Sequence, residues 1–123
     1  MRELTQAEEK VMQILWELKE AFVRDILEKF EGDKKPSYTT VSTVIRVLEG
    51  KGFVDHKVFG NTHLYFPKVS KEEYSEFAAF SMLEKYFSGS VGKLVSFFAK
   101  KEKVDIQDLD EVIKLINEKK SEE

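Results

Sequence analysis

The spacing of apolar residues changes at Gly50, and this change limits the fold more than any other feature of the sequence. Before it, apolar side chains recur every three or four residues, as on one face of an α-helix. The three segments with this spacing are about 6–18, 23–30 and 38–50. After it, two runs rich in aromatic and β-branched residues flank Gly60-Asn61, a pair suited to a type II′ hairpin. Three helices followed by a hairpin predict a winged helix-turn-helix.

Helical spacing then returns and continues to the end of the chain. The sequence predicts helices at about 71–88 and 91–101, and a last one after Asp105. Thr5 with Glu8, and Ser70 with Glu73, have the spacing of capping boxes. The predicted fold is therefore mostly α with a small β-hairpin wing: a winged-helix DNA-binding domain at 1–69 followed by an α-helical dimerisation domain at 70–123.

Composition excludes several classes of protein. With 41% apolar and 35% charged residues the chain is globular, and without cysteine it has neither disulfides nor thiolate metal sites. The N-terminus lacks the apolar core of a signal peptide, and no apolar run is long enough to span a bilayer. We therefore expect a cytoplasmic protein without membrane insertion. The net charge is −3, but residues 34–57 hold five basic and two acidic side chains, which is compatible with DNA binding.

The outward face of the 38–50 helix carries the clearest functional signal. A solvated helix face is usually rich in Glu and Lys, whereas here hydroxyl side chains and one arginine oppose the apolar stripe. Such side chains bind phosphates and base edges. The predicted DNA-binding residues on this helix are Tyr38, Thr39, Thr40, Ser42, Thr43 and Arg46, and those on the hairpin are Lys57, Asn61, Thr62 and His63. A weakly formed surface helix is the alternative for the first group, and turn or packing roles are the alternative for the second.

The C-terminal helices carry more apolar surface than three short helices can cover by themselves. A second copy of the chain would cover it, and a two-fold dimer would match a two-fold operator. The predicted dimerisation residues are Phe77, Phe80, Leu83, Phe87, Leu94, Phe98, Ile113 and Ile116. Packing of these helices back onto the N-terminal domain is the alternative.

Enzymatic chemistry is not expected, because no phosphate-binding loop, nucleophile elbow or zinc-protease motif occurs. We expect no cofactor and no metal. His56 and His63 are the two histidines, and cross-strand pairing would place them on one hairpin face, so a metal sensor is a remote alternative. A winged-helix module that binds proteins instead of DNA is the main rival, but it would not need a face of Thr, Ser and Arg.

Four segments resemble the penicillinase repressor family. They are Leu4-Thr5-Gln6-Ala7-Glu8, the segment around Trp16, Pro36-Ser37-Tyr38-Thr39-Thr40-Val41-Ser42-Thr43, and Lys51-Gly52-Phe53-Val54. The likeness continues into the segment from Leu94 to Lys100. It implies a winged-helix transcriptional repressor that binds palindromic operators as a homodimer and regulates antibiotic resistance. The absence of cysteine excludes the copper-responsive branch, which ends in Cys-x-Cys motifs.

The resemblance also implies a mode of control. In such repressors a membrane-bound sensor metallopeptidase detects a β-lactam, and the repressor is then cut at an Asn-Phe bond within Leu-Val-x-Asn-Phe-Ala. This chain reads Leu94-Val95-Ser96-Phe97-Phe98-Ala99, so Phe97 replaces the asparagine and Phe98 matches. The possible cleavage site is therefore the bond between Phe97 and Phe98.

Overall fold

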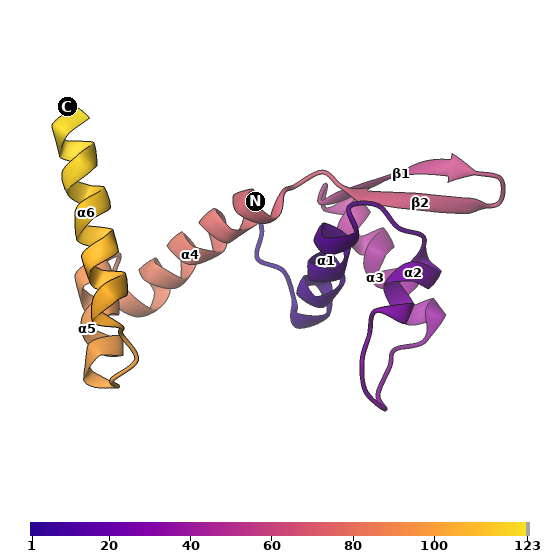
Figure 1. The fold of residues 1–123 in the computed structure, drawn as a ribbon. Coiled ribbons are helices and arrows are strands. Elements are labelled where there is room, and N and C mark those ends of the chain that lie inside the picture. Colours follow the sequence, from indigo (N-terminus) through magenta and orange to yellow (C-terminus); the bar gives the residue numbers. More distant parts are fainter. Residues whose placement is uncertain (123) are drawn as a thin grey trace. The chain divides into compact units, whose positions relative to one another are not determined.

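The computed structural model describes residues 1–122 as six helices and a two-stranded antiparallel sheet (Figure 1). The elements are α1 (Gln6–Leu18), α2 (Val23–Glu28), α3 (Tyr38–Gly50), β1 (Val54–Phe59), β2 (Thr62–Pro67), α4 (Lys71–Phe87), α5 (Val91–Lys100) and α6 (Ile106–Glu122). They divide into two compact units, Met1–Ala78 and Ala79–Glu123. The mostly helical fold with a hairpin wing that the sequence predicts is confirmed.

Side-chain caps begin the helices where the sequence predicts them. Thr5 Oγ1 accepts a hydrogen bond from the Glu8 amide at 3.2 Å, and Glu8 Oε1 accepts one from the Thr5 amide at 2.9 Å. Ser37 caps α3 through the Thr40 amide at 3.1 Å. The helix predicted at 23–30 ends earlier, at Glu28, because the next two amides bond the carbonyls three residues back and tighten the last turn.

The core of the first unit is built on the apolar stripe of α3. Val41, Ile45 and Leu48 are at most 1% exposed and pack with apolar residues of α1, α2 and the hairpin. Because these positions are spaced by three and four residues, they lie on one side of the helix. The opposite side of α3 therefore stays in solvent, as the DNA-binding hypothesis requires.

The hairpin buries the face that includes Val54 and Tyr65. Its sequence leaves open which face is buried, because apolar residues lie on both. β1 and β2 pair from Val54 with Pro67 to Phe59 with Thr62, so Gly60-Asn61 is a two-residue loop. Gly60 has φ +59°, the left-handed value that a type II′ turn needs at its first central position. Ala21 adds a short bridge to Tyr65 on the other edge of β2, which ties the wing to the segment before α2.

The first unit extends beyond residue 69 because the start of α4 belongs to its core. Tyr74 is 6% exposed, and its hydroxyl accepts a hydrogen bond from the Leu4 amide at 2.8 Å. Phe77 and Ala78 pack against the same core. Trp16 Nε1 donates to the Val69 carbonyl at 2.9 Å and fixes the chain just before the helix. The compact unit therefore ends nine residues after the predicted domain boundary.

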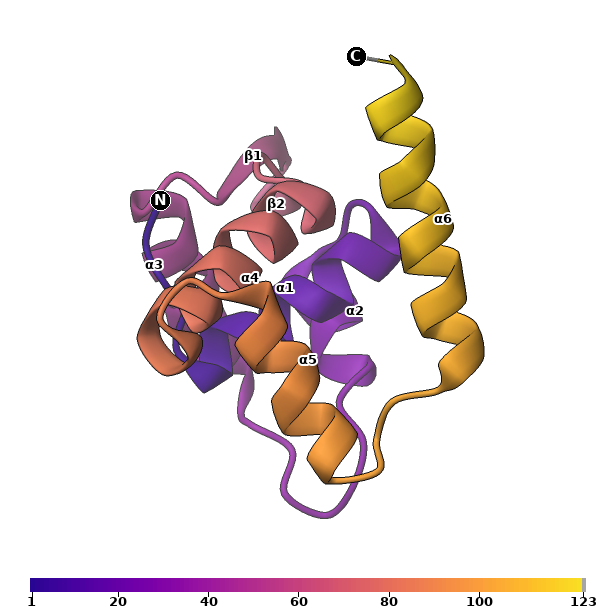
Figure 2. The ribbon, with the colours of Figure 1, turned by 90° about the vertical axis from the view of Figure 1, so that its left-hand side faces the viewer.

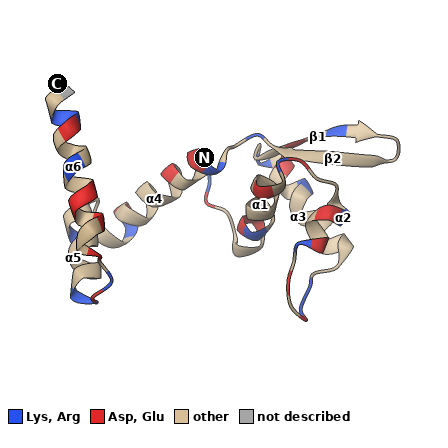
Figure 3. Ribbon diagram, in the orientation of Figure 1, with Lys and Arg blue, Asp and Glu red and all other residues tan. Residues whose placement is uncertain are grey.

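The second unit leaves much apolar surface uncovered within a single chain. None of the residues of α5 is buried, and the C-terminal turns of α6 extend away from α5 (Figure 2). Figure 3 shows acidic and basic residues interleaved along the ribbon of α6. Exposed aliphatic residues such as Ile113 and Ile116 lie in the same helix. No described helix is both long and apolar enough to cross a membrane.

A buried ion pair joins the beginning of α1 to the end of α3. Lys51 Nζ lies 2.8 and 2.7 Å from the two carboxylate oxygens of Glu8, which is 5% exposed. Burial by itself would raise the pKa of the Glu8 carboxyl. The hydrogen bonds from Lys51 and from Thr5 outweigh that effect and hold this pKa below its ordinary value of 4.5.

We predict that Lys51→Met lowers the free energy of unfolding by about 1.5–3 kcal/mol, because it leaves a buried carboxylate without its cation. Urea denaturation followed by circular dichroism measures the loss. Lys10→Met, at an exposed position of α1, is the matched control and should change stability little. Equal stability of the two variants would contradict a stabilising role for the pair.

The same pair predicts a pH dependence. A lowered pKa in the folded state means that the stabilisation is present above the unfolded pKa, near 4.5, and is lost as pH falls through the lower folded pKa. Wild type should therefore lose more stability than Glu8→Gln between pH 6 and pH 3. Parallel slopes for the two proteins would exclude this contribution.

Candidate nucleic-acid interface

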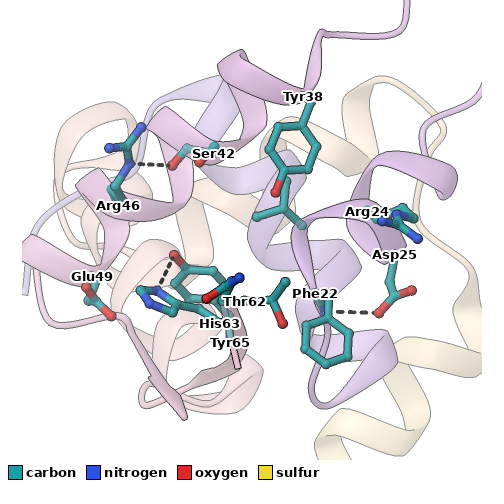
Figure 4. A pocket seen from close by; sticks show the side chains of 12 residues that line it. Phe22, Arg24, Asp25, Tyr38, Ser42, Arg46, Glu49, Thr62, His63 and Tyr65 are labelled. Carbon is teal, nitrogen blue, oxygen red and sulfur yellow. Dashed lines mark hydrogen bonds between the residues drawn. The ribbon is translucent and has the colours of Figure 1, made fainter. Parts of the chain in front are cut away.

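A groove of about 560 Å³ runs between α3, the N-terminal end of α2 and the wing (Figure 4). Six of the ten predicted DNA-binding residues line it, three from α3 and three from the hairpin. They are Tyr38, Ser42, Arg46, Asn61, Thr62 and His63. The structure therefore brings the two predicted groups together at one solvent-open surface.

The α3 side of the groove presents donors and an aromatic ring. Tyr38, in the first turn, is 55% exposed, and Arg46 is also exposed. Arg46 Nε donates to the Ser42 carbonyl at 3.3 Å, which directs the side chain along the helix surface (Figure 4). This bond uses Nε alone, so the terminal nitrogens of the guanidinium remain available for a base edge or a phosphate.

The other predicted α3 residues lie outside the groove. Thr39 and Thr43 are exposed, and Thr43 Oγ1 donates to the Thr39 carbonyl at 2.9 Å. Thr40 Oγ1 lies 2.9 Å from Ser37 Oγ, at the cap of the helix. The hydroxyls of Thr43 and Thr40 are thus engaged locally, and all three threonines are exposed residues of the N-terminal half of α3.

The wing separates its predicted residues onto two faces. His63 stacks on His56 with ring centroids 4.0 Å apart and an interplanar angle of 8°, and its Nδ1 lies 3.4 Å from the Tyr65 hydroxyl. Lys57 alternates with these residues along the strand, and its ammonium lies over the Phe66 ring at 5.7 Å. Lys57 therefore does not line the groove.

Arg24 and Glu49 also line the groove, although neither is among the DNA-binding residues that the sequence predicts. Arg24 is the second residue of α2, and in Figure 4 it lies across the groove from Ser42 and Arg46. The first helix of a helix-turn-helix crosses the DNA backbone, so a basic residue in its first turn was a usable signal. Glu49 lies in the last turn of α3, and its position in the sequence does not indicate that it lines the groove.

The floor of the groove holds a neutral phenol. Burial raises the pKa of Tyr65, and the nearby Glu49 carboxylate raises it further, while Arg46 opposes both. Tyr65 therefore remains protonated at neutral pH and adds no negative charge to the surface.

Known proteins of one family resemble this chain over almost its whole length. A family model described as "Penicillinase repressor" matches residues 4–118. The methicillin resistance regulatory protein MecI of Staphylococcus aureus (strain N315) is 29% identical over 117 residues, which cover 95% of both chains. The penicillinase repressor of Bacillus licheniformis is 21% identical over 119 residues, covering 97% of this chain and 93% of that protein.

The fold of the first unit also has a counterpart among solved structures. The solution structure of the DNA-binding domain of the repressor BlaI superposes with a TM-score of 0.51 at 22% identity. It covers 60% of this chain and 94% of that domain. The winged-helix architecture expected from the order of helices and hairpin is thereby confirmed.

Proposed function

This chain belongs to the penicillinase repressor family, and from that premise we propose that it represses transcription by binding a palindromic operator as a homodimer. Membership in a family of transcriptional repressors also means that it is not an enzyme. The names of its relatives refer to methicillin resistance and penicillinase, so we propose genes of β-lactam resistance as its targets.

One observation carries the proposal: α3 and the wing present donors to the same open groove. An α-helix fits the major groove of B-DNA, and hydroxyl and guanidinium groups on its outward face read base edges there. Ser42 and Arg46 have that position, with Tyr38 at the start of the helix. The wing residues beside them then reach the neighbouring phosphates, and Arg24 meets the backbone from α2.

Dimerisation through the C-terminal segment is supported by its exposed apolar side chains. Eleven large apolar residues from Phe80 onward are more than a third exposed in the single chain. Exposed apolar surface on this scale marks an interaction face. Of the predicted dimer residues, Phe80, Phe98, Ile113 and Ile116 are exposed, Phe87 and Leu94 are partly buried, and Leu83 is buried. Phe77 packs against the core of the first unit, so we expect it to stabilise that core and not the dimer.

Control by proteolysis is the regulatory part of the proposal, with a membrane-bound sensor metallopeptidase as partner. The candidate bond joins Phe97 and Phe98 in α5, whose side chains are 46% and 40% exposed. Phe97 packs edge-on against Phe87 at 5.7 Å. A cut there would separate α6 from the rest of the chain, weaken dimerisation and lower DNA affinity, because one half-site makes fewer phosphate contacts.

We predict that Arg46→Ala weakens binding to the operator by about 1–3 kcal/mol and weakens binding to scrambled DNA much less, because a base contact carries specificity. The probe is an inverted repeat upstream of the gene or its neighbour, titrated by fluorescence anisotropy at fixed salt. Arg2→Ala, outside the groove, is the matched arginine control. An equal loss on both DNAs would reassign Arg46 to a phosphate, and no loss on either would remove it from the interface.

The division into two units predicts that a fragment of residues 1–78 is folded but monomeric and binds the operator far more weakly than the full chain. It retains Tyr74 and its bond to Leu4, which a fragment ending at residue 69 would lose. Light scattering coupled to size exclusion gives the mass of each species. A stable dimer of 1–78 would overturn the assignment of dimerisation to the C-terminal segment.

Proteolytic control predicts two fragments, divided after Phe97, in cells exposed to a β-lactam inducer. Mass spectrometry of the protein from induced and uninduced cells measures them directly. An intact chain under full derepression would contradict cleavage and leave DNA binding itself untouched as a proposal.

A further inference from the structure

We propose that Glu49, Asp55 and His56 form a binding site for a divalent transition metal of the zinc class, between the end of α3 and the first strand of the wing. Each residue offers one ligand atom, and these atoms all lie within 4.8 Å of one another. The donor set is one imidazole nitrogen and two carboxylates.

The site joins two elements that meet through the fold. Glu49 lies in the last turn of α3, while Asp55 and His56 lie in β1 after the turn that contains Gly52. Gly52 has φ +84°, and this left-handed residue lets the chain reverse so that β1 returns alongside the helix. His56 Nδ1 already contacts Glu49 Oε1, and both side chains are about a quarter to a third exposed, at 25% and 32%.

The neighbours of these side chains hold them in place. The Asp55 carboxylate accepts a hydrogen bond from the His56 amide at 2.8 Å, which keeps it beside the imidazole. His63 stacks on one face of the His56 ring at 4.0 Å, and Tyr65 lies 5.6 Å away. Groups that fix a ligand's orientation raise metal affinity, because less motion is lost when the ion binds.

The ligand types select the class of ion. Calcium and magnesium prefer six or more oxygen ligands, whereas an imidazole nitrogen with two carboxylates suits zinc and similar ions. Three protein ligands leave a fourth position for water, as in open zinc sites. On binding, the ion would replace the direct contact between Glu49 Oε1 and His56 Nδ1, because both atoms would then be its ligands.

A bound ion would strengthen DNA binding, an effect that rests on the proposed function. Glu49 lines the groove, and its carboxylate and that of Asp55 repel phosphates. A divalent cation would cancel these two charges and link β1 to α3. The wing would then be held at the helix that reads the DNA.

The direct test is calorimetric titration of the chelator-treated full chain with zinc chloride. We expect one ion per chain in the wild type, an affinity at least about tenfold lower in Glu49→Gln, and no change in Glu9→Gln, an exposed carboxylate of α1. Absence of binding in the wild type, or equal affinity in Glu49→Gln, would overturn the site. Circular dichroism verifies that each variant is folded.

A second measurement uses the wild type alone. The chain has only two histidines, so nitrogen-15 spectra of the imidazoles resolve both. Zinc should shift the Nδ1 signal of His56 much more than either nitrogen signal of His63, and a larger shift at His63 would overturn the ligand assignment.

Operator titrations with zinc and with chelator separate this inference from the proposed function. Zinc should raise the operator affinity of the wild type about threefold or more. The operator affinity of Glu49→Gln should be the same with zinc as with chelator. Operator binding without zinc binding would refute the metal site alone. Zinc binding without operator binding would refute the proposed function alone.

Discussion

The ion pair between Glu8 and Lys51 joins the beginning of α1 to the end of α3, the helix that carries most of the predicted DNA-binding residues. Glu8 has two roles, since it also closes the capping box at Thr5. The pair therefore connects the first turn of α1 with the residue that follows α3. A buried pair of this kind is costly to break, because either partner alone would remain desolvated. Both residues also belong to the segments that resemble the family, and the structure shows that these segments meet.

Local signals predicted most of the fold because they act over a few residues. Capping boxes and apolar stripes depend on neighbours three or four positions away, so α1 and α3 begin and end where the sequence indicates. The hairpin loop is local in the same sense, because Gly60 supplies the conformation that the turn demands. The order of the elements, three helices followed by a hairpin, then predicted the fold class.

Contacts between distant residues were not predictable in the same way. The bond from Leu4 to Tyr74 spans 70 residues, and it moved the boundary of the first unit from 69 to 78. The buried face of the hairpin depends on which side meets α3, and apolar residues lie on both sides. For the candidate site, periodicity predicted which α3 residues oppose the buried stripe, and Tyr38, Ser42 and Arg46 of these line the groove, whereas Lys57 of the hairpin does not.

The structure also changes which charges are available for DNA. The sequence counts Lys51 among the basic residues of 34–57, yet its ammonium is engaged by Glu8. Glu49 Oε1 contacts His56 Nδ1, and the Glu49 carboxylate would oppose phosphates at the groove. Among the residues that line the groove, the positive charges are those of Arg46 and of Arg24 in α2, and they lie beside the carboxylates of Asp25 and Glu49. Because salt screens charges beyond about 10 Å, the side chains that line the groove count for more there than the chain's net charge of −3. The charge that a phosphate would meet at the groove therefore depends on where these four side chains lie and not on the composition of the whole chain.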